Sequence, residues 1–173
     1  MVVVSPSDSR RDPVIDRYAG RVVLIDARDR VLLFRGGDPA APERGSWWWT
    51  PGGGRRGGES PATAAARELA EETGLRVEPA ALGPVVWERV AEFSHNGRRY
   101  RQYEDYFRLR VDRYAVDMAG FTELERRMLH EYRWWSLDDL RLTSEIVYPT
   151  RMAELLPRLL AGPWTGPPER VGH

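Results

Sequence analysis

The chain has 173 residues, 42% hydrophobic and 30% charged, which is typical of a single globular domain with a buried core. Its 26 basic and 26 acidic side chains give a formal net charge of zero, which argues against a partner that is a nucleic acid polymer. The absence of cysteine and of lysine excludes disulfides, thiolate zinc sites, cysteine nucleophiles, the lysine-containing phosphate loop and lysine Schiff-base chemistry.

Residues 1–17 mix Ser, Pro, Asp and Arg, and we expect a flexible N-terminal arm or an edge strand there. No long apolar run suggests a signal peptide or a membrane span, so we expect a cytoplasmic protein without a membrane partner. The folded domain is predicted to cover residues 18–162, followed by a Pro/Gly-rich C-terminal tail over 163–173.

Two short apolar runs open the predicted domain. Residues 21–26 and 31–35 flank a polar turn and predict a hairpin of two buried strands. After a Pro/Gly-rich loop over residues 36–45, residues 47–50 predict a strand in which one or two of three consecutive tryptophans point into the core.

The next segment predicts a Gly-rich loop followed by a helix. Ser60 is a good N-cap, Pro61 suits the first helical position and Gly74 suits a left-handed residue just past the end. A narrow apolar stripe that can pack on a sheet is formed by Ala62, Ala65 and Leu69.

Three glutamates of this helix lie within five residues, namely Glu68, Glu71 and Glu72. At about 100° per residue, Glu72 lies roughly 40° from Glu68 and Glu71 roughly 60° to the other side, so the carboxylates share one face. Like charges at this spacing destabilise a helix by about 0.2–0.5 kcal/mol per pair, and a hard divalent cation would offset that repulsion.

The loop and helix resemble the Nudix box at every specified position. The pattern is Gly, five residues, Glu, seven residues, then Arg-Glu-aliphatic-any-Glu-Glu-any-Gly-aliphatic. The matching residues are Gly53, Glu59, Arg67, Glu68, Leu69, Glu71, Glu72, Gly74 and Leu75. Similarity at the level of the motif runs from about Trp47 to Leu75, and looser resemblance covers most of the rest.

Further strands and helices are predicted after the box. Residues 85–93 and 99–111 predict a hairpin around Asn96-Gly97, 122–130 a short helix or structured loop, and 132–137 another strand. Ser136 leads into a short helix, and Thr150 is predicted to cap a last helix over residues 151–161. Strands, a helix, antiparallel strands and a final helix indicate an α+β domain. The resemblance implies a Nudix-like α/β/α sandwich with a mixed β-sheet between helices.

The resemblance also implies an activity and a metal site. We expect a pyrophosphohydrolase that cleaves a nucleoside diphosphate linked to another moiety, with Mg²⁺ or Mn²⁺ as cofactor. Glu68, Glu71 and Glu72 are the implied metal ligands, with the Gly53 carbonyl as another. Arg67 is expected either to orient Glu71 at i,i+4 or to pair with Glu59.

The general base stays open between two groups of carboxylates. Glu71 and Glu72 belong to the box, whereas Glu123, Glu125 and Glu131 follow it at a distance. Glu125 has a competing interpretation as the partner of Thr122 in a capping box. Glu131 precedes an aromatic strand and either points into the site or lies on the surface.

Three residues are candidates for substrate binding. Trp49 can stack on a nucleobase or pack in the core, and Arg99 and Arg101 can hold phosphate or cover an exposed strand face.

Two other functions remain as alternatives. A diphosphate isomerase of the same fold would need a catalytic cysteine, which is absent. A non-catalytic nucleotide-binding module commonly loses box glutamates, and all are present here. No motif selects one nucleotide, and a homodimer through Val2-Val3-Val4 is a hypothesis.

Overall fold

The structure is a computed structural model, and it describes residues 13–38, 41–95, 98–117, 119 and 129–172. The strands are β1 (Val14–Ile25), β2 (Val31–Gly36), β3 (Trp47–Trp49), β4 (Gly52–Gly54), β5 (Val85–His95), β6 (Arg98–Arg110), β7 (Leu129–Trp135), β8 (Val147–Tyr148) and β9 (Glu169–Arg170). The helices are α1 (Pro61–Thr73), α3 (Leu137–Leu142) and α4 (Met152–Leu160), with short 3-10 turns η1 (Pro42–Arg44) and η2 (Pro79–Leu82).

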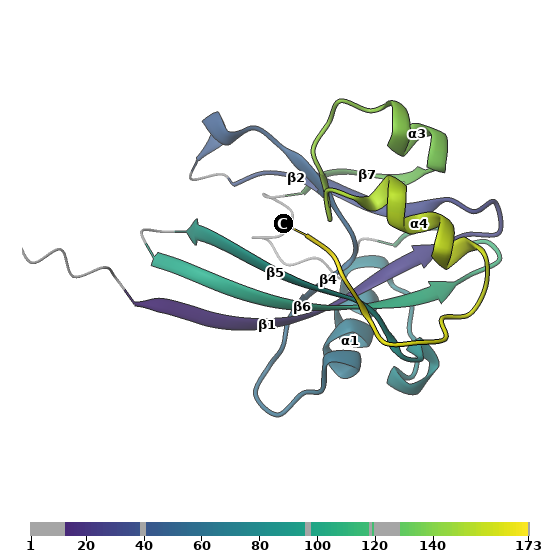
Figure 1. Ribbon diagram of the computed structural model, residues 1–173, viewed down its shortest axis with the longest axis horizontal. Coiled ribbons are helices and arrows are strands. Elements are labelled where there is room, and N and C mark those ends of the chain that lie inside the picture. Colours follow the sequence, from purple (N-terminus) through teal and green to yellow (C-terminus); the bar gives the residue numbers. More distant parts are fainter. Residues whose placement is uncertain (1–12, 39–40, 96–97, 118, 120–128, 173) are drawn as a thin grey trace, which may run out of the picture.

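The strands form one mixed sheet in the order β8-β3-β2-β1-β6-β5-β9, with β4 paired to β1 and β7 paired to β2. The longest pairing is the parallel one between β1 and β6, which runs in register from Val14 opposite Arg99 to Ile25 opposite Arg110. At one end of the sheet, β1, β5 and β6 extend beyond the helices as a long ribbon (Figure 1).

Successive side chains of β1 point to opposite faces of the sheet, so the core is divided between the two faces. Val22 and Leu24 join a buried cluster with α1, whereas Val23 and Ile25 join a cluster with α4. Figure 1 shows α1 on one side of the sheet and α3 and α4 on the other. The predicted α/β/α sandwich with a mixed sheet is therefore confirmed.

The predicted ends of α1 are also confirmed. The Ser60 hydroxyl accepts the Thr63 N–H at 3.1 Å, and Pro61 is the first helical residue. Gly74 has φ 78° and its N–H donates to the Ala70 carbonyl. Buried Ala65 and Leu69 place the expected apolar stripe against the sheet.

A glycine in β1 allows α1 to pack directly on the strand. A Cβ on Gly20 would lie 2.2 Å from the Pro61 carbonyl oxygen and 2.8 Å from the Ala65 nitrogen, both of them backbone atoms. Since backbone cannot move aside cheaply, Gly20→Ala is expected to destabilise the protein by about 1–3 kcal/mol, measured by urea denaturation. Gly172→Ala is the control, because its Cβ would meet nothing within 4 Å. Equal stability of the two variants would contradict this packing.

Some predicted boundaries differ in the structure. Residues 14–17, expected in the arm, belong to β1 because they pair with β6. Of the expected tail, Glu169 and Arg170 form β9 against β5, and Val171 is buried. The last helix begins at Met152 with Arg151 as its N-cap, so the predicted cap at Thr150 is wrong. The Pro149 carbonyl accepts the Met152 N–H instead, which satisfies the start of the helix through a turn.

The structure also tests the predicted hairpin and the strand predicted over residues 132–137. β5 and β6 form the expected hairpin, while its turn at Asn96-Gly97 lies outside the described residues, as do residues 122–128 with Glu123 and Glu125. The strand predicted over 132–137 ends at Trp135, because Ser136 caps α3. Among the described helices, none is long and apolar enough to cross a membrane.

Candidate active site

Two adjoining segments build the candidate site. β4 pairs with β1 through Gly52, Gly53 and Gly54, opposite Arg21, Gly20 and Ala19 respectively. α1 packs over the same part of β1, so the Gly-rich strand and the acidic turns of the helix face each other. Because Gly53 has no side chain, the backbone of β4 can approach Glu68 closely. A Cβ on Gly53 would lie 2.5–2.7 Å from the carboxylate atoms of Glu68.

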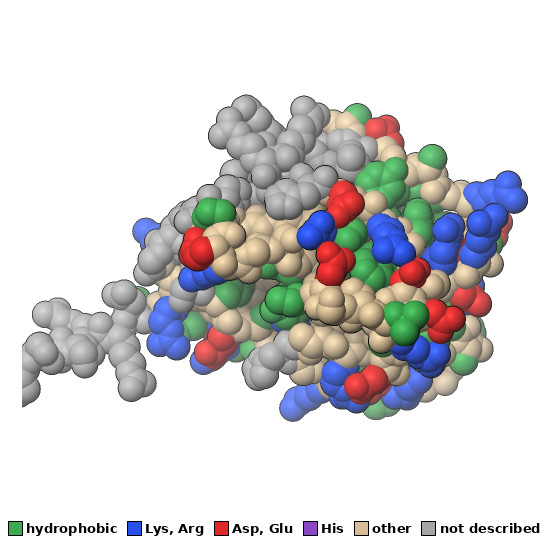
Figure 2. Space-filling view, turned by 90° about the horizontal axis from the view of Figure 1, so that it is seen from above, with side chains coloured by type: hydrophobic (Ala, Val, Ile, Leu, Met, Phe, Trp, Pro, Cys, Tyr) green, Lys and Arg blue, Asp and Glu red, His purple; other side chains and the backbone are tan. Residues whose placement is uncertain are grey.

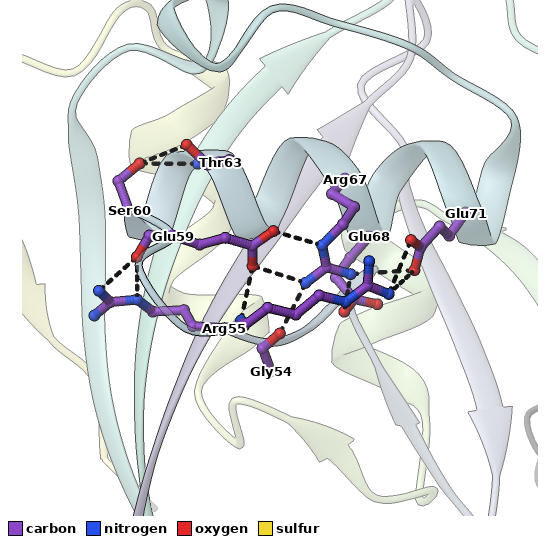
Figure 3. A network of polar contacts seen from close by, with 9 residues as sticks. Gly54, Arg55, Glu59, Ser60, Thr63, Arg67, Glu68 and Glu71 are labelled. Atoms are coloured by element: carbon purple, nitrogen blue, oxygen red, sulfur yellow. Dashed lines mark hydrogen bonds and ion pairs between the residues drawn. The ribbon is translucent and has the colours of Figure 1, made fainter.

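Arg67 is the centre of the polar contacts between the loop and the helix (Figure 3). Its Nε and Nη2 donate to the two oxygens of Glu59 at 2.8 and 3.0 Å. Its Nη1 donates to Glu68 at 2.6 Å and to Glu71 at 3.1 Å, and Nη2 also donates to the Gly54 carbonyl at 2.9 Å. Arg67 therefore makes both of the contacts that the sequence offered as alternatives.

Glu59 joins the loop to the helix, because it accepts hydrogen bonds from the Arg56 N–H and from the Arg67 side chain. Two hydrogen bonds lower the pKa of Glu59 to about 2, and the one from the Arg67 side chain contributes more than the one from the Arg56 N–H. Glu59 is therefore ionised at neutral pH and holds Arg67 in place.

Glu71 is the most open of the three helix glutamates. Its side chain is 36% exposed, against 12% for Glu68. Its described partners are guanidinium groups, because Arg56 Nη2 lies 3.1 Å from one oxygen and Arg67 Nη1 3.1 Å from the other.

Glu72 is the most buried of the three helix glutamates. It is buried, with 7% of its surface exposed, and it accepts the Gly52 N–H at 2.7 Å. Over the described residues, no three acidic or histidine side chains converge into a group that could hold a metal ion. The described partners of the three differ as well, because Glu68 and Glu71 accept from Arg67 whereas Glu72 accepts from the Gly52 N–H.

The donor set still fits a hard divalent cation. One cationic nitrogen, Arg67 Nη1, already lies between oxygens of Glu68 and Glu71. These are the oxygen ligands that Mg²⁺ prefers. Ligation by Glu68, Glu71, Glu72 and the Gly53 carbonyl remains a prediction.

A buried ionic network supports the turn next to Glu72. Glu104 on β6 is 2% exposed and accepts Arg21 Nε at 2.8 Å and Arg89 Nη1 at 2.9 Å. It also accepts hydrogen bonds from Gln102 at 2.8 Å and Tyr106 at 2.7 Å. Arg21 Nη1 in turn donates to the Thr50 carbonyl at 3.1 Å, which ties the network to the loop before β4.

The charges of this network keep Glu104 ionised. Burial alone would raise its pKa, but the charges of Arg21 and Arg89 and the hydrogen bonds from Arg89 and Tyr106 outweigh it and lower the pKa to about 2. Burial and the negative charge of Glu104 raise the pKa of the Tyr106 phenol, which stays a neutral donor.

Two other candidates from the sequence, Glu131 and Trp49, lie on β7 and β3. Glu131 on β7 pairs with Arg35 of β2 at 2.9 Å, and its role as a base stays a prediction. Trp49 is partly buried against the core cluster beneath α1, whereas Trp48 is 2% exposed, as expected for one or two inward tryptophans.

Arg99 and Arg101 lie on the projecting part of β6. Arg101 donates to Glu92 at 2.9 Å, and Arg99 lies 4.0 Å from the same side chain. Their partners on β1 are Val14 and Asp16, while β4 begins its pairing at Ala19. At about 3.3 Å per residue, these arginines lie roughly 17 and 10 Å along the strand from the box. The structure therefore does not bring them to the carboxylates.

Sequence reasoning missed Arg21 and Glu104, which are 83 residues apart. Their contact depends on the parallel pairing of β1 with β6, and no local pattern specifies that pairing. One weak signal was present, because Gln102, Glu104 and Tyr106 place polar groups on one face of a long strand.

Comparisons with known proteins identify the family and the fold of the chain. The sequence matches the family model of the NUDIX domain over residues 16–159. The fold is similar to that of the MutT protein from Methanosarcina mazei Go1, with TM-score 0.57 and 17% identity, covering 86% of this chain and 95% of that one.

Two further solved structures have the same fold. An Ap4A hydrolase from C. elegans has TM-score 0.50 and 18% identity, covering 86% of this chain and 97% of its own. A UDP-X diphosphatase has TM-score 0.50 and 18% identity, covering 94% of this chain and 70% of its own. At these identities the likeness concerns the fold alone.

Proposed function

The chain is a pyrophosphohydrolase of the Nudix family, and we propose that it cleaves the diphosphate bond of a nucleoside diphosphate linked to another moiety, with Mg²⁺ or Mn²⁺. The observation that carries the proposal is the placement of Glu68 and Glu71 around one cationic nitrogen, directly beside Gly53. Members of this family generally use divalent metal ions and act on small nucleotide-type molecules.

In this proposal Glu68, Glu71, Glu72 and the Gly53 carbonyl hold the metal. When bound, the cation neutralises phosphate charge and lowers the pKa of water. Arg67 orients Glu68 and Glu71 through its Nη1 and is itself fixed by Glu59. The Gly52 N–H fixes Glu72 in a buried position, where it loses little side-chain entropy when it binds a ligand.

Glu71 is our candidate for the general base. Its carboxylate is the most open of the three, and its contacts are with two guanidinium groups, which can orient it while it accepts a proton from water. Glu72 and Glu131 are the alternatives, and Glu71→Gln and Glu131→Gln compared in pH–rate profiles would separate them.

The substrate does not follow from the fold, because a UDP-X diphosphatase and an Ap4A hydrolase share it. A panel of nucleoside triphosphates, ADP-ribose, dinucleoside polyphosphates and nucleotide sugars would identify the best substrate from phosphate released with a coupled phosphatase.

Removal of divalent cations is expected to abolish this hydrolysis. Excess EDTA should reduce phosphate release to background, and Mg²⁺ or Mn²⁺ added above the chelator should restore it, because the acidic site would otherwise repel a phosphorylated substrate. The coupled phosphatase is added after the reaction has been quenched, so that the chelator acts on this protein alone. Full activity in EDTA would contradict the proposal.

A further inference from the structure

We propose that a cleft between β1 and the loop after β4 binds a phosphate group of the substrate beyond the two whose bond is cleaved. The inference rests on the proposed function, because it assigns a substrate class to the same site. The cleft has a volume of about 430 Å³, within the range of small-molecule sites. Its lining residues are Asp16, Arg17, Tyr18, Gly54, Arg55, Arg56, Gly57 and Gly58.

The charge of the lining favours an anion. Three arginines and one aspartate line the cleft, and Arg56 is paired with Glu71. The charges of Arg17 and Arg55 against that of Asp16 therefore leave an excess of one positive charge. The chain as a whole has no net charge, and Figure 2 shows basic and acidic side chains interspersed over the face seen from above. The excess is therefore a local property of the cleft, and a volume of this size suits a phosphate group and not a polymer.

Two of the basic side chains, Arg17 and Arg55, are available to a ligand. Among the described residues, Arg17 contacts no carboxylate, and its guanidinium lies over the Tyr100 ring at 5.6 Å. Arg55 lies over the Tyr18 ring at 5.6 Å and donates to the Glu59 carbonyl, so its position is set without an ion pair to an acidic side chain. Guanidinium groups bind phosphate oxygens through two parallel N–H bonds.

The cleft adjoins the box, because two of its lining residues contact box residues. Arg56 lines it and also contacts Glu71 at 3.1 Å, while the Gly54 carbonyl in its wall accepts from Arg67. A phosphate chain whose reacting pair lies at the glutamates can therefore extend into the cleft. Nucleoside triphosphates or dinucleoside polyphosphates offer such a group, whereas a diphosphate joined to a neutral sugar does not.

The first test removes a charge from the cleft without touching the box. Inorganic tripolyphosphate is titrated calorimetrically in EDTA into the wild type, Arg17→Gln and Arg28→Gln. Arg28 is an exposed arginine in the turn between β1 and β2, so Arg28→Gln is the matched control. Loss of a charge-assisted contact should weaken binding by about tenfold in Arg17→Gln and leave Arg28→Gln unchanged. Arg55→Gln, on the opposite wall, should repeat the loss.

The second test measures selectivity with Mg²⁺ present. Arg17→Gln should lower kcat/KM for a nucleoside triphosphate about tenfold relative to kcat/KM for ADP-ribose. If tripolyphosphate does not bind the wild type, or binds the wild type and Arg17→Gln equally, the proposal that the cleft binds phosphate is wrong, whichever compound is hydrolysed. If tripolyphosphate binds as expected but no compound is hydrolysed, the proposed function is wrong, whereas phosphate binding by the cleft is supported.

Discussion

Glu72→Gln is expected to lower kcat/KM on the best substrate by at least about 100-fold, a typical loss for a metal ligand or general base. The amide keeps the shape of the side chain and can still accept the Gly52 N–H, now 2.7 Å from the carboxylate. The loss should therefore come from the missing negative charge and not from unfolding.

Two controls make this result specific. Glu78→Gln removes an exposed glutamate just after α1 and should leave kcat/KM unchanged. Urea denaturation of Glu72→Gln should give a free energy of unfolding close to that of the wild type. Wild-type activity in Glu72→Gln would remove Glu72 from the proposed metal site.

Glu104→Ala is expected to destabilise the protein by about 3–5 kcal/mol, because it leaves Arg21 and Arg89 without their buried counter-ion. The measurement is the free energy of unfolding at pH 7 in urea. Glu92→Ala is the control, since it breaks an exposed cross-strand pair with Arg101 and should cost less than about 1 kcal/mol. Similar losses in both variants would contradict a special role for the buried network.

The same residue predicts a dependence on pH. Folding lowers the pKa of Glu104 from 4.5 to about 2. Its ionisation therefore stabilises the fold above pH 4.5, and this contribution of about 3 kcal/mol is lost as the pH falls through 2. The stability difference between the wild type and Glu104→Gln should shrink between pH 4.5 and pH 2, and a constant difference would contradict the assignment.

Local chemistry explains what could be predicted from the sequence. Ser60, Pro61 and Gly74 specify the ends of α1 through hydrogen bonds to neighbouring backbone, so the helix and its acidic face follow from a short segment. The same holds for the β5–β6 hairpin, which needs only an apolar pattern and a turn.

Long-range pairings explain what could not be predicted. The contact of Arg21 with Glu104 and the packing of Gly20 on α1 require a sheet order that no single segment specifies. The contact of the Gly52 N–H with Glu72 likewise depends on the pairing of β4 with β1. The cap predicted at Thr150 was wrong because the N–H of Met152, at the start of the helix, donates to the Pro149 carbonyl in a turn.

The parallel pairing of β1 with β6 bears on how the molecule reaches its native state. The Arg21–Glu104 contact closes a loop of 83 residues, and contacts of such separation slow folding because chain entropy is lost before they form. A nascent chain that ends before β6 lacks the counter-ion of Arg21 and the neighbour of β1. The helix of the box can form early on the ribosome. The turn around Thr50 that precedes Gly52 is supported by Arg21 and Glu104 only after β6 has emerged.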